Sequence, residues 1–225
     1  MSDKSDNQPS STYSDAVFES LRSDIVGGLF APGTKLAMKP LTERFTVGAS
    51  PIREALHRLA GEGLVDFVGQ RGFRVPPLSL ADLNDLTDLR ILLEAAAVKQ
   101  ALTHGDDAWE ARLVAAFHQL ALHLKKQDAS YNTAAYERVH RQFHVAMYAG
   151  VVTPRLQALH SHLYDQAHRY RQAFIHEEVP PAKVLSEHKK LLTVFLARDV
   201  EAATAQMCKH LELTRTAAKH HLKKL

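Results

Sequence analysis

Apolar residues recur at helical spacing in three stretches near the start of the chain. In residues 14–26 they return every three or four positions until a glycine pair ends the pattern. Shorter patterns of the same kind predict helices over residues 39–45 and 50–62. The last of these carries its own start signal, because the hydroxyl of Ser50 can cap a helix and Pro51 suits a first turn.

This third predicted helix has an apolar face and a polar face. Ile52, Leu56 and Leu59 fall on one side of it. Arg53 and His57 lie one turn apart on another side and can face outward. A short helix that is held by its apolar face and exposes serine and arginine at its N-terminus can enter the major groove of DNA.

Two short runs rich in β-forming residues follow, over residues 64–68 and 73–75. The glycines that bound the segment between them predict a tight turn and hence a hairpin. Arg71 and Arg74 place positive charge on this hairpin. A separate turn is expected at Pro32-Gly33. Three helices followed by a hairpin are typical of a winged helix-turn-helix domain.

A proline pair at residues 76 and 77 marks a domain boundary, because it neither continues a strand nor fits inside a helix. We therefore expect a disordered N-terminus over residues 1–12, a winged helix-turn-helix domain over residues 13–77 and an all-helical domain over residues 78–225. The helical patterns of the last domain cover residues 79–104, 106–127, 130–149, 154–178, 181–198 and 199–225. The expected fold class is mostly α, a winged helix-turn-helix plus an antiparallel helical bundle.

The composition is that of an ordinary globular protein, with 45% hydrophobic and 24% charged residues among 225. A single cysteine, Cys208, excludes an internal disulfide and a multi-cysteine zinc site. Because no apolar run approaches the roughly 20 residues that span a bilayer, and no signal core begins the chain, we expect a cytoplasmic protein without a membrane partner. Net charge is +3, but residues 1–77 hold nine Lys and Arg against nine Asp and Glu. The case for DNA therefore depends on where the charges lie.

Fourteen histidines are present, and four have a spacing that suits a metal site. His140 and His144 are four residues apart on one predicted helix, so they project from the same face. His188 and His210 lie on two later helices, and facing helices of a bundle can hold a metal between them. Neutral imidazole is a common ligand of zinc and nickel. The alternative is a set of half-buried histidines, each hydrogen-bonded to a backbone carbonyl.

Arg90 lies among leucines in the first predicted helix of the bundle. An intrahelical ion pair with Glu94, one turn later, is its simplest explanation. In a functional role Arg90 would instead point inward and grip a carboxylate with its planar guanidinium. The sequence contains no Gly-x-Ser-x-Gly nucleophile motif and no Gly-rich phosphate loop, so we expect no catalytic residues.

From Ser14 onward the chain resembles bacterial GntR-type transcription regulators of the FadR branch, which pair a winged helix-turn-helix with an all-helical FCD ligand-binding domain. APGTKL at residues 31–36, SPIREAL at residues 50–56 and RGFRV at residues 71–75 resemble the family's turn, recognition helix and wing. The resemblance implies DNA contacts at Lys39, Gly48, Ala49, Ser50, Arg53 and Gly72, to which the polar helix face and the wing charge add His57 and Arg71. Ala49 stands where an arginine is often found.

The second half resembles the FCD domain through RILLE at residues 90–94, RQFH at residues 141–144 and EH at residues 187–188. Metal-binding members use an Asp four residues before the Phe-His histidine, that histidine and two later ones. The implied ligands are His144, His188 and His210, which match this set, and His140, which takes the Asp position. The resemblance implies a divalent transition metal, zinc ahead of nickel or manganese, and a small carboxylate effector that also pairs with Arg90.

The predicted function is that of a DNA-binding transcription regulator, a homodimer on a palindromic double-stranded operator. A small organic acid bound at the metal would change its DNA affinity. The alternative is a metal-dependent hydrolase that uses the winged helix as a protein-interaction module, although no general base is evident beside the histidines. In a third possibility, all four histidines close the coordination of a purely structural metal.

Overall fold

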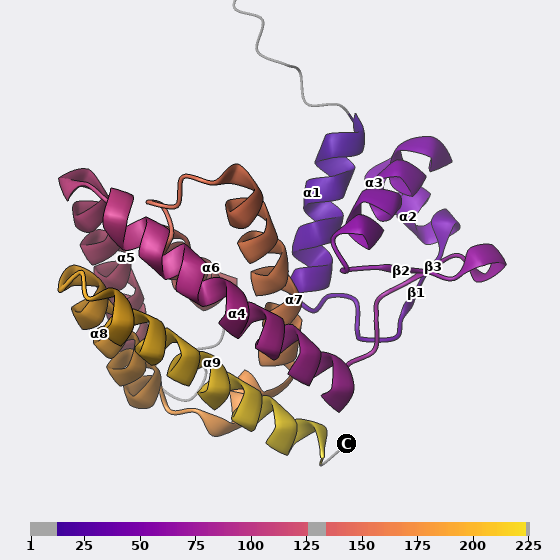
Figure 1. The fold of residues 1–225 in the computed structure, drawn as a ribbon. Helices are drawn as coiled ribbons and strands as arrows, with labels where there is room; N and C mark the ends of the chain where they lie inside the picture. Colours follow the sequence, from indigo (N-terminus) through magenta and orange to yellow (C-terminus); the bar gives the residue numbers. More distant parts are fainter. Residues whose placement is uncertain (1–12, 126–133, 224–225) are drawn as a thin grey trace, which may run out of the picture. The chain divides into compact units, whose positions relative to one another are not determined.

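The computed structural model describes residues 13–125 and 134–223. The expected disordered N-terminus and the predicted start of one helix at residue 130 lie outside this part of the chain. The chain divides into two compact units, residues 1–77 and residues 78–225. Figure 1 shows helices beside a small sheet in the first unit and helices alone in the described part of the second.

The first unit has the winged helix-turn-helix arrangement that the sequence predicts. Its elements in chain order are α1 (Tyr13–Val26), β1 (Lys35–Leu36), α2 (Met38–Phe45), α3 (Ala49–Gly61), β2 (Asp66–Phe67), the 3-10 turn η1 (Gly69–Arg71) and β3 (Phe73–Arg74). The strands form an antiparallel sheet in the order β1-β3-β2, in which Leu36 and Phe67 both pair with Phe73. The hairpin of β2 and β3 is the wing.

The apolar faces predicted for the first and third helices form the core of this unit. Leu21 and Ile25 of α1 are buried against α3, where Ile52 and Leu56 are also buried. Phe73 of the wing belongs to the same core. Because one side of α3 is buried in this way, its opposite side is left to solvent and to any partner.

One local prediction in this unit is wrong, and one strand was not predicted. α3 begins at Ala49 with Gly48 as its N-cap residue, so Ser50 lies in the first turn and its side chain makes no capping hydrogen bond. The predicted turn at Pro32-Gly33 is confirmed, and a strand that the sequence does not predict, β1, forms just after it. β2 and β3 are equally short but lie in runs of β-forming residues on either side of a turn, whereas no such run surrounds β1.

The second unit is helical throughout the residues described. It comprises α4 (Leu80–His104), α5 (Asp107–Lys125), α6 (Ala134–Met147), α7 (Pro154–Glu178), α8 (Pro181–Leu196) and α9 (Val200–Leu222). Two predicted helix starts are confirmed by their caps. Ser79 Oγ accepts a hydrogen bond from the Asp82 amide at 3.1 Å, and Asp199 Oδ1 accepts one from the Ala202 amide at 2.9 Å.

The helices of the second unit pack as a bundle around one main core. α4 packs against α7 and α9, and α5 packs against α6 and α8 (Figure 1). Trp109, Phe143 and Phe195 are buried in this core. His144, the neighbour of Phe143 on α6, is also buried, so α6 carries an imidazole into the apolar interior. None of the described helices is both long enough and apolar enough to cross a lipid bilayer.

Candidate nucleic-acid interface and metal centre

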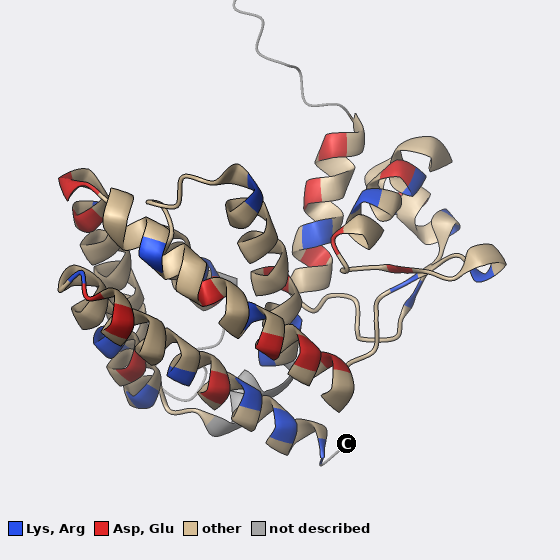
Figure 2. Cartoon of the chain, in the orientation of Figure 1, with Lys and Arg blue, Asp and Glu red and all other residues tan. Residues whose placement is uncertain are grey.

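The outward side of α3 carries half of the eight residues that the sequence assigns to DNA contact. All but one of these eight residues are exposed, and Gly72 is half-buried. The exposed ones are Lys39, Gly48, Ala49, Ser50, Arg53, His57 and Arg71. One groove between α3 and the wing is lined by four of the eight residues: Arg53, His57, Arg71 and Gly72. Lys39 and residues 48–50 lie outside the lining of this groove. Figure 2 shows a basic residue on the turn of the wing.

The turn of the wing depends on a glycine at residue 72. Gly72 has φ 81° and ψ −144°, a combination that residues with a side chain rarely adopt. The Val68 amide donates a hydrogen bond of 2.9 Å to the Gly72 carbonyl and closes the turn. This backbone geometry holds the exposed side chain of Arg71 at the end of the wing.

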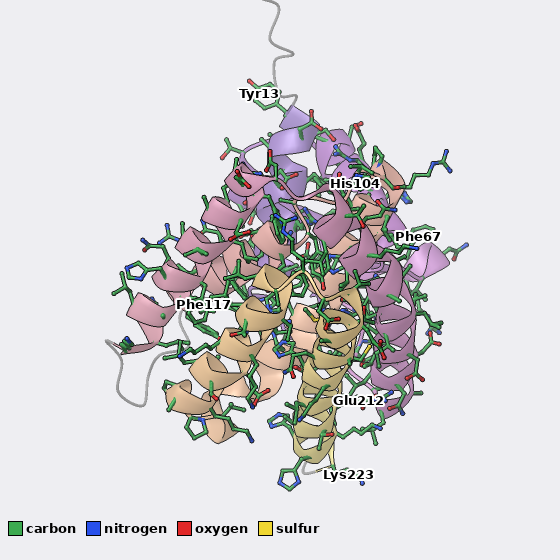
Figure 3. All side chains as sticks on the ribbon, turned by 60° about the vertical axis from the view of Figure 1, so that its left-hand side comes forward. Tyr13, Phe67, His104, Phe117, Glu212 and Lys223 are labelled. Carbon is green, nitrogen blue, oxygen red and sulfur yellow. The ribbon has the colours of Figure 1, made fainter. Side chains whose placement is uncertain are left out.

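His57 connects α3 to the wing, a contact that its position in the sequence does not reveal. Its ring centroid lies 4.9 Å from that of Phe73 and 5.1 Å from that of Phe67. Phe67, labelled in Figure 3, is 53% exposed on the wing. These rings brace the wing against α3 by aromatic contact while His57 remains exposed.

Four histidines from three helices converge inside the second unit. His140 and His144 come from α6, His188 from α8 and His210 from α9. The Nε2 atoms of His144 and His188 are 3.3 Å apart. One ring nitrogen from each of His140, His144 and His188 lies within 4.8 Å of the others. The His210 ring centroid is 5.0 Å from that of His188 and 5.4 Å from that of His144.

The imidazoles of the cluster are neutral, and a backbone hydrogen bond orients the ring of His188. His188 Nδ1 lies 2.7 Å from the Val184 carbonyl oxygen, and because a carbonyl only accepts, Nδ1 carries the proton and Nε2 presents a lone pair. Burial lowers the pKa of His188 to about 4. Burial, together with the neighbouring imidazoles, lowers the pKa of His140, His144 and His210 well below 6.5. Neutral imidazole is the form that binds a metal ion.

Three arginines surround Tyr164 next to the imidazoles. The guanidinium carbons of Arg171, Arg141 and Arg90 lie 4.8, 5.3 and 6.0 Å from the centroid of its ring. The Tyr164 hydroxyl is 2.9 Å from Nδ1 of His140. Burial raises the pKa of Tyr164 to about 12, so the phenol stays neutral. Of these residues the sequence pointed only to Arg90. The seven-residue spacing of Tyr164 and Arg171, which places both on one face of α7, is the signal that indicates Arg171.

Arg90 is buried, but it does not form the ion pair with Glu94 that the spacing predicts. Glu94 instead accepts a hydrogen bond from the Tyr148 hydroxyl and lies 3.4 Å from His160 Nε2. Among the described residues, no carboxylate lies within ion-pairing distance of Arg90. Burial lowers the pKa of Arg90, and the charge of Glu94 acts in the opposite direction. A buried guanidinium of this kind is a favourable partner for an added anion.

Two cavities adjoin the imidazole cluster. The polar residues that line the first include Arg141, His144, Tyr148, His160, Ser161 and Tyr164. The polar residues that line the second include His140, Arg171, Lys183, Glu187, His188 and His210. Each cavity therefore has at least one imidazole of the cluster and one arginine in its wall.

Known protein families match both units. Residues 13–75 match the family described as bacterial regulatory proteins, gntR family, and residues 85–213 match the FCD domain. The HTH-type transcriptional regulator BphR of Paraburkholderia xenovorans (strain LB400) is 38% identical over 200 residues, which cover 88% of this chain and 82% of BphR. The HTH-type transcriptional repressor GlaR of Escherichia coli (strain K12) is 37% identical over 196 residues, which cover 85% of this chain and 89% of GlaR.

A solved structure has the same fold. The Escherichia coli protein McbR/YncC superposes with a TM-score of 0.80 at 21% sequence identity, over 94% of this chain and 99% of that one. At this level of identity the likeness supports the arrangement of the helices and says nothing of a ligand.

Proposed function

The chain belongs to the GntR family of bacterial transcription regulators and contains an FCD domain, and we propose that a small organic acid, bound beside a histidine-held metal, changes its affinity for operator DNA. The observation that carries this proposal is the convergence of buried imidazoles and three arginines in one region of the second unit. A cation site and an anion site would be neighbours in the same domain.

In the proposed DNA complex, α3 enters the major groove. Ser50 and Arg53, both exposed in the first turns of α3, would reach base edges, whereas Lys39 and Arg71 would contact phosphates. A homodimer would present two copies of α3 to a two-fold-related operator. Because the first unit has no net charge, its binding would depend on these placed contacts more than on a general attraction to DNA.

We propose that His140, His144, His188 and His210 hold a divalent ion such as zinc or nickel. The donor set fits, since imidazole nitrogen suits zinc and nickel, whereas manganese prefers carboxylate and water oxygens. The Val184 carbonyl fixes the ring of His188, as a supporting residue of a metal site commonly does. When bound, the ion would supply a Lewis-acidic centre for an anionic oxygen.

The proposed acid would occupy the cavity whose wall includes Arg141, His144 and Tyr164. Arg90 lies outside the lining of this cavity, but its guanidinium is 6.0 Å from the ring of Tyr164 in the cavity wall and has no carboxylate partner among the described residues. It would pair with the acid's carboxylate from beside Tyr164. Apolar side chains such as Val151 also line this cavity, which favours a short carbon chain with one or two carboxylates. Binding there would couple to DNA affinity by about 1–3 kcal/mol, the usual size of allosteric coupling.

Two other functions remain to be distinguished from this one. A metal enclosed by four histidines would be structural, but the two cavities that reach the imidazoles favour an accessible ion. A metal-dependent hydrolase would be revealed by turnover, and against it stand relatives that are named as transcription regulators.

The proposal is tested in two steps with the full chain. Selection from random DNA duplexes should enrich a two-fold-related sequence whose affinity falls steeply with salt. Small mono-, di- and hydroxycarboxylates are then added to zinc-loaded and to chelator-treated protein. An acid that shifts operator affinity about 5- to 150-fold only with zinc present would support the proposal. If the metal raises the melting temperature but no acid shifts operator affinity, the metal is structural. If the protein consumes an acid, it is the hydrolase.

A further inference from the structure

The basic residues of the first unit divide into those that form ion pairs and those that do not. Three arginines of its described part form ion pairs, each of which includes a residue of α1. The pairs are Arg22 with Glu62, Arg44 with Asp24 and Arg58 with Asp15. The remaining basic residues of that part form no ion pair with any described residue. They are Lys35, Lys39, Arg53, Arg71 and Arg74.

The groove between α3 and the wing gathers three of these unpaired cations. Lys35 lines it together with Arg53 and Arg71. Neither aspartate nor glutamate is among the described residues that line it. Although residues 1–77 have no net charge, this groove therefore presents positive charge alone. A cationic groove without carboxylates attracts phosphate groups.

Lys35 occupies an electrostatically unfavourable place in the sheet. It lies on the edge strand β1, directly opposite Arg74 of β3. Arg74 has Asp66 of β2 opposite it on its other side, whereas Lys35 has no such carboxylate. Figure 2 shows basic residues on the strands of this sheet. Like charges directly opposite each other on neighbouring strands oppose folding, so the placement of Lys35 is better explained by a function than by stability.

The two walls of the groove suit the DNA backbone. In B-DNA a single sugar-phosphate backbone separates the major groove from the adjoining minor groove. α3, which would enter the major groove, forms one wall, and the wing forms the other. A backbone that follows the edge of the major groove would therefore pass between α3 and the wing, where the cations lie.

We propose that Lys35 contacts a phosphate of the DNA backbone seated in this groove. The linear pattern does not indicate this contact, because it depends on the pairing of β1 with β3. The phosphate supplies the negative charge that Lys35 lacks in the free chain. The inference rests on the DNA binding of the proposed function, but it requires neither the metal nor the acid.

The test measures DNA binding by the full-length chain over a range of salt concentrations, with fluorescence anisotropy as the signal. One duplex is the sequence enriched by selection, and the other has a random sequence. Lys35→Gln should weaken binding to both by the same factor, about five- to tenfold at about 0.1 M salt. It should also lower the slope of log affinity against log salt by about 0.9 for each bound copy of the chain.

Two further variants serve as controls for the salt experiment. Lys35→Arg keeps the positive charge, so it should bind both duplexes with the salt slope of the unaltered chain. Lys125→Gln removes an exposed lysine from α5, in the second unit, and should leave both affinities and the slope unchanged.

Thermal unfolding without DNA separates this role from a structural one. Lys35→Gln removes the like charge opposite Arg74, so its melting temperature should equal or exceed that of the unaltered chain. Lys35→Glu places a carboxylate opposite Arg74, so it should raise the melting temperature and weaken binding to both duplexes more than Lys35→Gln does. A purely structural role of Lys35 predicts a lower melting temperature for both variants.

Three results would each overturn the inference: an unchanged salt slope for Lys35→Gln, a loss of affinity confined to the selected duplex, or a lower melting temperature. The proposed function can fail separately. If no acid shifts DNA affinity but Lys35→Gln lowers the salt slope on the random duplex, this inference stands and the proposed regulation fails. If an acid shifts operator affinity while Lys35→Gln leaves the slope unchanged, the reverse holds.

Discussion

The Nε2 atoms of His144 and His188 lie 3.3 Å apart, although 44 residues separate the two histidines in the chain. Two nitrogens bound tetrahedrally to one zinc ion at roughly 2.0–2.1 Å are about 3.3–3.4 Å from each other. The fold of the second unit therefore sets two imidazoles, one from α6 and one from α8, at the separation that a shared ion requires. This agreement supports the proposed metal and gives the first prediction.

Replacing His188 with alanine should remove metal binding. Loss of a residue that only supports a metal ligand lowers metal affinity roughly 10- to 100-fold. Because the variant loses one of the proposed ligands itself, we expect its zinc affinity to fall by at least as much. Elemental analysis and the zinc-dependent rise in melting temperature measure this. His104→Ala, at the exposed end of α4 (Figure 3), is the matched control and should bind zinc normally. Equal zinc content in the two variants would argue against the site.

Metal-free protein should lose stability as the pH falls from 7 to 4. Burial lowers the pKa of His188 to about 4 and that of His144 well below the ordinary 6.5. Below pH 6.5 the unfolded chain therefore takes up protons that the folded chain excludes, and the free energy of unfolding decreases until the folded pKa is reached. Urea denaturation at several pH values measures this slope.

The control for the pH effect is a double variant, His144→Gln with His188→Gln. Its free energy of unfolding should depend less on pH between 6.5 and 4 than that of the unaltered chain, because two of the shifted groups are gone. Identical pH slopes for the two proteins would show that the buried imidazoles do not titrate differently on unfolding.

Arg53→Ala should weaken operator binding and reduce its selectivity. If Arg53 contacts a base edge from α3, its loss should cost about 1–3 kcal/mol and flatten the discrimination between operator variants at that base pair. Fluorescence anisotropy with a set of singly substituted operators measures both effects. Arg112→Ala, at an exposed arginine of α5, serves as the control for loss of positive charge. Retained discrimination would remove Arg53 from base recognition.

Gly72→Ala should destabilise the wing. No atom lies within 4 Å of the position that a Cβ would take, so the cost comes only from the backbone conformation at φ 81°. We expect the free energy of unfolding of the first unit to fall by about 1–3 kcal/mol, with weaker DNA binding. Gly61→Ala also meets open space but lies within α3, so it should be neutral or slightly stabilising. Equal melting temperatures for the two variants would contradict the backbone argument.

Arg90→Gln should abolish most of the response to the acid while leaving the metal in place. Glutamine keeps a polar side chain but removes the charge that would pair with the effector's carboxylate. We expect about 10- to 100-fold more acid to be needed for the same change in operator affinity. Arg155→Gln, at an exposed residue in the first turn of α7, is the control. An unchanged acid response together with normal zinc content would exclude Arg90 from the effector site.

The sequence by itself determined the local structure of this chain and the outward side of α3. The caps at Ser79 and Asp199 and the exposure of Arg53 follow from residues within about one helical turn of each, so a linear pattern contains them. The start of α3 was missed for a related reason, because Gly48 and Ser50 both suit an N-cap and only the packed helix selects one. The four-residue spacing of His140 and His144 likewise predicted that these two of the four clustered histidines lie on one helix face.

Only the tertiary structure decided which distant side chains meet. Helical spacing suggested that Arg90 pairs with Glu94, yet in the packed unit Glu94 contacts Tyr148, just after α6, and His160 of α7 instead. Tertiary packing also brings Arg90 of α4 and Arg141 of α6 to Tyr164 of α7, which no local pattern required. Contacts of this kind depend on how helices cross and which rotamers fill the space between them, and this information is shared among residues tens of positions apart.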